Sequence, residues 1–141
     1  ALHRKTGKLQ WRKPRPAEQS YASPLVAHVA GKDQVLLCGA YLVASYDPNT
    51  GAELWSQEGT TKSCAGTMVY SDDLVYATGG YPDASVACYR ADGSGELVWK
   101  NNKKLYVPSL LLHDGHLYAA NDGGIAFCWN AKTGKNAWTA D

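Results

Sequence analysis

The sequence lacks the features that mark several large functional classes. No hydrophobic run approaches the length of a transmembrane helix, and no signal peptide is visible. The net charge is only +1 and the charged residues are scattered, so neither a nucleic-acid surface nor a membrane-binding patch is present. No window shows a convincing apolar period of about 3.6 residues. We therefore expect no nucleic-acid partner, no membrane span and no helical fold.

Common catalytic signatures are missing as well. Serine, histidine and aspartate do not occur in a G-x-S-x-G or comparable context, and the Gly-Gly pairs at 79–80 and 123–124 lack the following helix that a phosphate-binding loop requires. The four cysteines are widely spaced and never form a C-x-x-C pair. We therefore expect no catalytic residues, no cofactor and no metal site, and a chain that is not an enzyme.

What the chain does contain is a repeat. The segment ALHRKTGKLQW at 1–11 returns as SYDPNTGAELW, CYRADGSGELVW and CWNAKTGKNAW. Each copy opens with a small residue, continues with Thr-Gly or Ser-Gly, and closes with tryptophan four residues after the glycine. Four of the five tryptophans therefore share one phase, 44, 44 and 39 residues apart. A period of about 40 residues indicates an array of propeller blades or helical pairs.

Each copy has the chemistry of a tight hairpin. Its turn is rich in Asp, Asn, Pro and Gly, most clearly in Asp47-Pro48-Asn49-Thr50-Gly51. Asp and Asn side chains bond nearby backbone N–H groups, proline presets φ, and glycine accepts a positive φ. The flanks roughly alternate β-branched and aromatic residues, as on a pleated surface. The sequence therefore predicts an all-β fold, in which four short antiparallel strands per repeat make one β-propeller blade.

The predicted domain is a single partial β-propeller of about three and a half blades over residues 1–141. It comprises a half blade at 1–13 and complete blades at 21–57, 63–100 and 106–141. The strands are expected at 22–29, 34–39, 42–46 and 53–56, at 65–70, 74–78, 84–90 and 96–100, and at 107–113, 116–120, 125–130 and 136–139. Because the chain begins inside a repeat, we expect a further portion upstream.

The recurrent tryptophan has a structural explanation. The last strand of a blade lies at the rim, where a large ring covers apolar surface between neighbouring blades, and a small residue and a nearby glycine leave room for it. The expected docking residues are Trp11, Trp55, Trp99 and Trp138, with Gly7, Gly51, Gly95 and Gly134. Cys88 and Cys128 occupy the small-residue position, so we expect them to serve packing. A Cys38–Cys64 disulfide stays an alternative, because pairing cannot be deduced from sequence.

The unit A/S/C-x-(D/N)-x-x-T-G-x-x-x-W resembles the tryptophan-docking motif of quinoprotein-type propellers. That group includes the PQQ-dependent alcohol dehydrogenases and the outer-membrane assembly lipoprotein BamB. More narrowly, segments 73–100 and 106–135 resemble uncharacterised PQQ-like repeat proteins of planctomycete-type bacteria. The chain departs from the unit by one inserted residue in the third copy, and at Lys5, Arg90-Ala91 and Lys132. The resemblance covers essentially the whole chain and implies a periplasmic or cell-envelope location in a bacterium.

The resemblance also defines what PQQ chemistry would require. Such enzymes hold the quinone at the ring's centre between a tryptophan and a disulfide of adjacent cysteines, beside a Ca²⁺ ion, and this sequence has no adjacent cysteine pair. Two metal alternatives stay open. Asn121-Asp122 and Asp92 carry oxygen ligands suited to a hard cation. His113 and His116, on either side of an Asp114-Gly115 turn, would face one another as a zinc pair, without an evident third ligand.

The function that we expect is a non-catalytic binding or scaffolding module with a protein partner. Propellers bind through the loops that connect their strands, because the loops are exposed while the strands fix their positions. The candidate loops are 57–63, 79–83, 101–106 and 121–124, and the side chains expected to contact a ligand are Tyr81, Tyr106 and Asp122. The alternative is a part of a PQQ-dependent dehydrogenase propeller whose catalytic residues lie outside this segment.

An incomplete ring exposes an apolar face at each end, and exposed faces of that kind mark interfaces. Two copies contain about seven blade-equivalents, a normal propeller number, and two-fold dimers are the commonest assembly. We therefore expect a homodimer in which residues 1–13 of one copy lie against residues 107–141 of the other. The competing expectation is a truncated piece of a longer chain that stays monomeric or aggregates.

Overall fold

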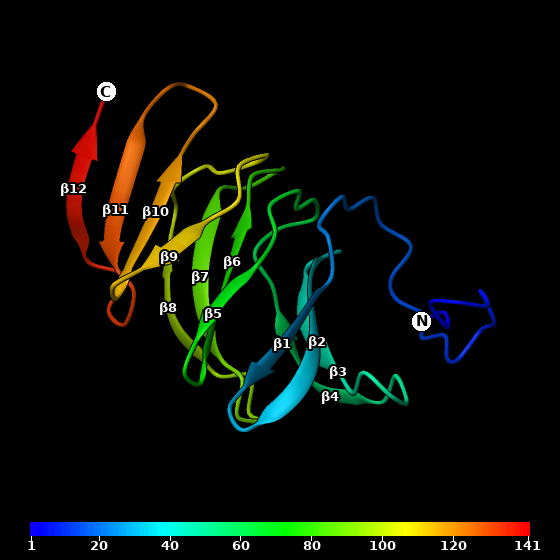
Figure 1. The fold of residues 1–141 in the computed structure, drawn as a ribbon. Coiled ribbons are helices and arrows are strands. Elements are labelled where there is room, and N and C mark those ends of the chain that lie inside the picture. Colours follow the sequence, from blue (N-terminus) through cyan, green and yellow to red (C-terminus); the bar gives the residue numbers. More distant parts are fainter.

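The computed structural model describes residues 1–141 as twelve strands in three sheets, with no helix. Each sheet is a four-stranded antiparallel meander, so strands that follow one another in sequence are neighbours in space. The three sheets are stacked face to face along the chain (Figure 1). The predicted class, a partial β-propeller, is confirmed. The structure contains no helix long and apolar enough to cross a membrane.

The strand bounds define the three blades. Blade 1 contains β1 (Leu25–Val29), β2 (Lys32–Gly39), β3 (Leu42–Tyr46) and β4 (Glu53–Glu58). Blade 2 contains β5 (Val69–Ser71), β6 (Leu74–Gly79), β7 (Ser85–Arg90) and β8 (Leu97–Asn101). Blade 3 contains β9 (Leu111–His113), β10 (His116–Ala120), β11 (Ala126–Asn130) and β12 (Asn136–Ala140).

The first strand of each blade is shorter than expected, because its ladder begins three or four residues later than the sequence indicates. Pro24 stands directly before β1, and Pro108 lies three residues before β9. Proline lacks the N–H group that a ladder needs, so it holds the preceding segment out of the sheet. Before β5 the same position is filled by Gly66, whose missing side chain lets the Pro108 backbone approach closely.

A β-bulge recurs at one place in every blade. The register between the third and fourth strands shifts just after the small residue of the repeat, between Ser45 and Tyr46 in blade 1. The equivalent shifts follow Cys88 and Cys128. Before each shift, the small residue pairs directly with the tryptophan of the same repeat. A bulge increases local twist, and here it occurs at the same place beside every tryptophan.

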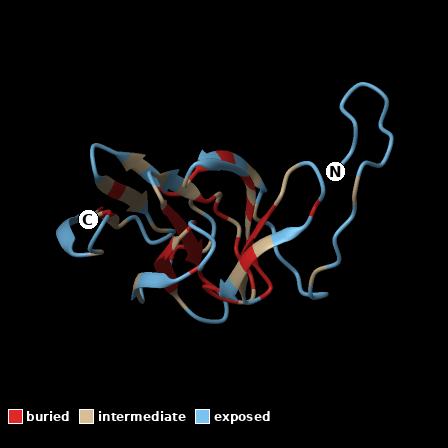
Figure 2. Ribbon diagram, turned by 90° about the horizontal axis from the view of Figure 1, so that it is seen from below, coloured by how far each residue is buried: buried red, intermediate tan, exposed pale blue.

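The core lies between the blades and not within any one of them. A cluster of 13 buried residues joins blades 1 and 2, and a second cluster of 10 joins blades 2 and 3. The buried residues run as a band through the middle of the molecule (Figure 2). The inner strands β1, β5 and β9 lie side by side. Because each sheet buries both faces only when it has two neighbours, the outer faces of blades 1 and 3 stay open.

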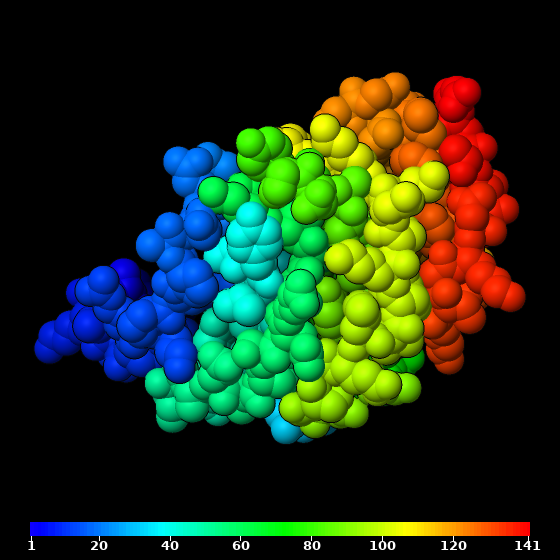
Figure 3. All heavy atoms as spheres, turned by 180° about the vertical axis from the view of Figure 1, so that it is seen from behind, coloured from blue at the N-terminus to red at the C-terminus, as the bar shows by residue number.

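Residues 1–13 form a hairpin, but not the two strands that the sequence predicts for a half blade. Leu2 and Leu9 make a single β-bridge, with the His3 N–H donating to the Lys8 carbonyl at 2.8 Å. No further strand pairs with this hairpin, so its ladder does not extend as it does inside the blades. It projects from one end of the molecule, opposite β12 (Figure 3).

Candidate functional site

The tryptophans of the repeat reach the following unit. The Trp99 ring lies on Gly134, where an added Cβ would come within 2.6 Å of the ring, and its indole N–H donates to the Ala131 carbonyl at 2.8 Å. Trp11 repeats this arrangement on Gly51 and donates to a carbonyl of that turn at 2.8 Å. Both glycines have positive φ. Glycine is therefore required for its backbone conformation and for the space that it leaves.

Between blades 1 and 2 the joint includes a buried glutamine. Trp55 lies on Gly95, and its indole N–H donates to Oε1 of Gln34 at 3.0 Å. The amide nitrogen of Gln34 donates in turn to the Ala91 carbonyl at 2.8 Å, the position equivalent to the acceptor of Trp99. Gln34 also accepts from Ser45 at 2.6 Å, and it is fully buried. The Gln34 amide therefore bridges the Trp55 indole and the Ala91 carbonyl. At the other joints the indole N–H bonds the equivalent carbonyl directly.

Each end of the chain carries one unmatched half of such a joint. Trp138 is 45% exposed, contacts Tyr118 of its own blade at a ring distance of 6.2 Å, and has no acceptor for its indole N–H. Gly7 has a φ of 68°, like the docked glycines, but a Cβ added to it would meet no atom within 4 Å. The ends are thus chemically complementary: a free tryptophan at one and a free glycine turn at the other.

The turns after the second strand of each blade and the linkers between blades gather at one end of the sheets, which we call the loop face. Figure 1 shows its β6–β7 and β10–β11 turns at the top. Tyr41 and Tyr81 stand in the first two of these turns, with exposures of 46% and 59%. Both follow a Gly-x-Tyr pattern, at 39–41 and 79–81. The repeated Gly-x-Tyr pattern could have identified Tyr41 as an exposed turn residue like Tyr81, but Tyr41 was not predicted from the sequence.

The linker between blades 1 and 2 ties these two turns together. The backbone N–H of Tyr41 donates to the Thr61 carbonyl at 3.1 Å, and that of Ser63 donates to the Tyr81 carbonyl at 3.0 Å. Lys62, between them, forms an ion pair with Glu18 at 2.9 Å. The hydrogen bond to Glu18 raises the pKa of Lys62, and the neighbouring Tyr41 and Tyr81 raise it further. The loop face thus presents two exposed tyrosines beside a lysine, on a backbone fixed at both ends.

The other predicted contact residues also lie on the loop face. Tyr106 is half-buried, and its backbone packs against Gly80, where an added Cβ would lie 2.5 Å from the Tyr106 Cα. Tyr106 and Tyr81 are therefore brought close together. Asp122 is exposed in the β10–β11 turn and lines a shallow hollow with Lys104 and Asn121. The structure places all three predicted side chains at one end of the blades, with Asp122 in a hollow of its own.

Among the residues considered as metal ligands, Asp92 and Asn121 have hydrogen-bond partners within their own turns. Asp92 accepts hydrogen bonds from the Ser94 hydroxyl and N–H, and the hydroxyl bond, followed by the N–H bond, lowers the pKa of this carboxyl. The Asn121 side-chain oxygen accepts two backbone N–H groups of its own turn. His113 and His116 pair directly across β9 and β10. No group of three His, Cys, Asp or Glu side chains is assembled anywhere in the chain.

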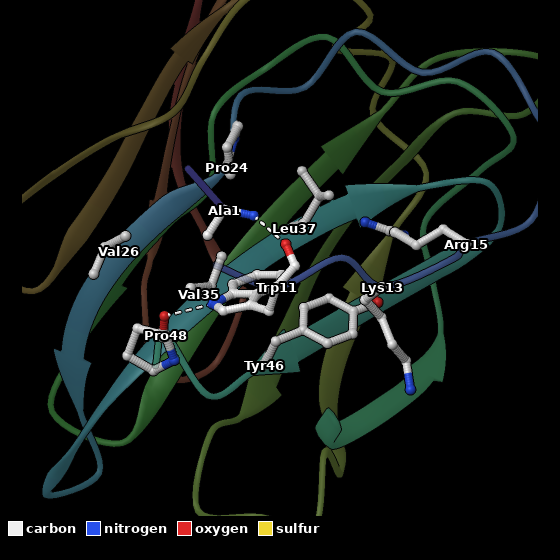
Figure 4. Close-up of a pocket in the computed structure, with 10 residues that line it drawn as sticks. All are labelled: Ala1, Trp11, Lys13, Arg15, Pro24, Val26, Val35, Leu37, Tyr46 and Pro48. Atoms are coloured by element: carbon white, nitrogen blue, oxygen red, sulfur yellow. Dashed lines mark hydrogen bonds between the residues drawn. The ribbon is translucent and has the colours of Figure 1, made fainter. Parts of the chain in front are cut away.

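The outer face of blade 1 carries an apolar groove of about 390 Å³ that sequence reasoning did not identify. The N-terminal hairpin covers it only partly, with Trp11 set between Pro48 and Tyr46 and its N–H bonded to the Pro48 carbonyl (Figure 4). The lining residues are Ala1, Trp11, Lys13, Arg15, Pro24, Val26, Val35, Leu37, Tyr46 and Pro48. Equivalent faces are filled between the other blades, so we interpret the groove as an incomplete blade joint.

Comparison with known proteins agrees with this architecture. Residues 1–140 match the family profile described as "Outer membrane protein assembly factor BamB". Among curated proteins, none matches the sequence closely enough to count as a relative.

Three solved structures illustrate the likeness. BamB from Moraxella catarrhalis has a TM-score of 0.76 at 19% identity, covering 96% of this chain and 43% of that chain. A europium-containing methanol dehydrogenase has a TM-score of 0.76 at 16% identity, covering 94% and 27%. The quinohemoprotein alcohol dehydrogenase ADHIIG from Pseudomonas putida HK5 has a TM-score of 0.71 at 16% identity, covering 90% and 21%. At these identities the likeness shows the propeller fold alone.

The chain spans less than half the length of these solved structures. The family match, in contrast, extends over nearly all of its residues and agrees with the blade structure and the tryptophan repeat. The chain therefore belongs to the family described as outer membrane protein assembly factor BamB.

Proposed function

We propose that this chain is a non-catalytic binding or scaffolding module of the bacterial cell envelope, and that it binds a protein partner through its loop face. One observation carries the proposal: the linker 59–63 is hydrogen-bonded to both tyrosine turns, so Tyr41 and Tyr81 are exposed on a fixed backbone. Tyrosine supplies large contact area at a low entropic cost, and it is enriched among the residues that dominate protein interfaces. The family description supports the envelope location. The narrower resemblance to planctomycete-type proteins stays a prediction.

Site-specific photo-crosslinking tests the proposed face. With p-benzoylphenylalanine introduced at Tyr81 or Tyr106 in a bacterial periplasm, we expect a protein adduct of discrete mass. The same group at Lys132, exposed in the β11–β12 turn at the opposite end of blade 3, is the matched control and should give none. Once the adduct is identified, Tyr81→Ala should weaken its binding about tenfold, since tyrosine anchors contribute upwards of about 1 kcal/mol. Equal adducts at both ends would contradict the proposal.

The alternative is part of a PQQ-dependent dehydrogenase propeller whose catalytic residues lie outside this segment. The propeller likeness favours it, but the residues of this chain do not themselves provide a donor set for PQQ. No two cysteines are adjacent in sequence, and all four thiols are buried. No cluster of carboxylates is assembled for a cation. We therefore expect no saturable PQQ binding and no dye-linked alcohol oxidation, with or without Ca²⁺. Titration followed by quinone absorbance checks this, and a micromolar dissociation constant would favour the dehydrogenase.

We also propose a homodimer through the open ends, in which Trp138 of one copy docks on the Gly7 turn of the other. The support is the unmatched pair described above, a ring without an acceptor and a positive-φ glycine without a ring. Light scattering over a range of concentrations should give a dimer mass, and deletion of residues 1–13 should convert it to a monomer. Trp138→Ala should have the same effect. A monomer mass at every concentration would refute the dimer and leave the end faces to further blades.

A further inference from the structure

Two buried cysteines meet at the joint between blades 1 and 2. Cys38 lies on β2 of blade 1, and Cys64 lies on the linker that leads into blade 2. Both are at most 1% exposed, and both belong to the cluster that joins these blades. The Ser20 hydroxyl oxygen lies 3.4 Å from the Cys38 carbonyl and 3.2 Å from the Cys64 carbonyl. One small side chain therefore spans the two cysteine backbones.

The Cys38 side chain also points toward the segment that carries Cys64. Its thiol donates to the Gly66 carbonyl at 4.0 Å, two residues beyond Cys64, and the Cys64 sulfur lies 3.1 Å from the Thr60 hydroxyl. The Ala40 N–H donates to the Lys62 carbonyl at 2.8 Å, so the two backbones run side by side next to the cysteines. The hydrogen bond from Cys38 lowers the pKa of Cys64 to about 6, with help from the Thr60 and Thr61 hydroxyls. The same contact, together with burial, raises the pKa of Cys38 well above its usual value. The two opposite shifts favour Cys64 over Cys38 as the thiolate of the pair.

We propose that Cys38 and Cys64 form a disulfide that locks blade 1 to blade 2 in an oxidising compartment. The remaining cysteines are placed differently: Cys88 packs in the second cluster, between blades 2 and 3, and Cys128 lies on the open face of blade 3 opposite Trp138. Neither is a member of the cluster that holds the pair. The bond would fix the middle of the linker, directly after Ser63, whose N–H donates to the Tyr81 carbonyl. It would therefore restrain the linker backbone to which the Tyr81 turn of the loop face is hydrogen-bonded.

The reaction is a thiol–disulfide exchange with a small disulfide such as oxidised glutathione. The Cys64 thiolate attacks one glutathione sulfur, forming a mixed disulfide and releasing one glutathione thiolate. Cys38 then loses its proton and attacks the Cys64 sulfur, forming the Cys38–Cys64 bond and releasing the second glutathione. The protein pair loses two electrons and glutathione disulfide gains them. The Cys38 proton and one from solvent complete the two glutathione thiols.

Refolding in a glutathione redox buffer tests the proposal without relying on access to the folded core. The full chain is refolded with oxidised and reduced glutathione, denatured, treated with N-ethylmaleimide and weighed. We expect two maleimide adducts, against four for the fully reduced chain, and a proteolytic map that links Cys38 to Cys64. The bond closes a loop of about 26 residues, which should raise the melting temperature by about 10 °C. Dithiothreitol should reverse that rise.

Matched variants separate this pair from the other two thiols. The Cys88→Ser and Cys128→Ser double variant should keep both the linkage and the reductant-sensitive rise in melting temperature. Cys64→Ala should keep neither, and all three of its remaining thiols should be alkylated. Four adducts on the refolded wild-type chain would overturn the proposal, as would linkage to Cys88 or Cys128 in a comparable share. The wild-type mass decides the question even where a variant fails to fold.

Discussion

Replacing Trp55 by alanine is expected to lower the free energy of unfolding by about 3–5 kcal/mol, the usual cost of emptying a large aromatic site. The Trp55 side chain is only 5% exposed, and it belongs to the cluster that joins blades 1 and 2. Its ring fills the space over Gly95, and its N–H is bonded inside the joint. Truncation therefore removes apolar contacts and one of the two hydrogen bonds that the Gln34 side-chain oxygen accepts. Urea unfolding followed by far-UV circular dichroism measures the loss.

Trp138→Ala is the control that separates the effect of losing a docked ring from the effect of losing any indole. Trp138 occupies the same phase of the repeat but is 45% exposed and has no glycine turn beneath it. We expect a change within about 1 kcal/mol for the monomeric chain, as for most exposed positions. Trp99→Ala should resemble the Trp55 variant, since Trp99 is docked on Gly134. Equal effects at Trp55 and Trp138 in the monomeric chain would refute the docking role, which is still a prediction.

Gln34→Leu is expected to destabilise the fold by about 3 kcal/mol or more, although leucine is more hydrophobic and similar in size. The buried amide satisfies four partners: it donates to the Val29 and Ala91 carbonyls, and it accepts from Ser45 and Trp55. Leucine leaves all four without this bond, and each buried polar group left unpaired costs about 1–3 kcal/mol. Urea unfolding gives the difference directly.

Gln57→Leu is the matched control for the amide, because Gln57 is exposed on β4 of the same blade. Its effect should stay within about 0.5 kcal/mol. The Gln34→Leu and Trp55→Ala changes should combine to less than their sum, because both remove the same hydrogen bond. If Gln34→Leu is as harmless as Gln57→Leu, the amide does not support the joint.

The strands and their order were predictable from sequence, because a repeat with turn chemistry at a fixed phase leaves few alternatives to a blade. The sequence did not predict which unit each tryptophan contacts. A one-dimensional period is the same whether Trp99 contacts its own blade or the turn at Gly134 in the next. The bridging role of Gln34 was hidden for a related reason. Its alternation with Leu36 and Cys38 marks an inward position, but sequence does not show which groups lie there.

The candidate site was recoverable in part. Loop position and residue type led to Tyr81, Tyr106 and Asp122, and the structure places them at one end of the blades. Tyr41 escaped because its turn contains only two residues, Ala40-Tyr41, both with positive φ, a conformation unusual for tyrosine. Its closeness to Tyr81 depends on backbone bonds of the linker 59–63, which a sequence pattern does not encode.

The position of the joints has a consequence for how chains of this kind change length. Every blade carries a tryptophan for the unit after it and a glycine turn for the unit before it, both in the same hairpin. Duplicating one whole blade therefore adds one tryptophan and one glycine turn together. Every existing tryptophan still has a glycine turn in the unit that follows it. Loss of a whole blade is equally neutral in this respect, whereas a cut inside a hairpin destroys two joints at once. Stability in such arrays depends on nearest neighbours, so genetic gain and loss should be tolerated in steps of one repeat.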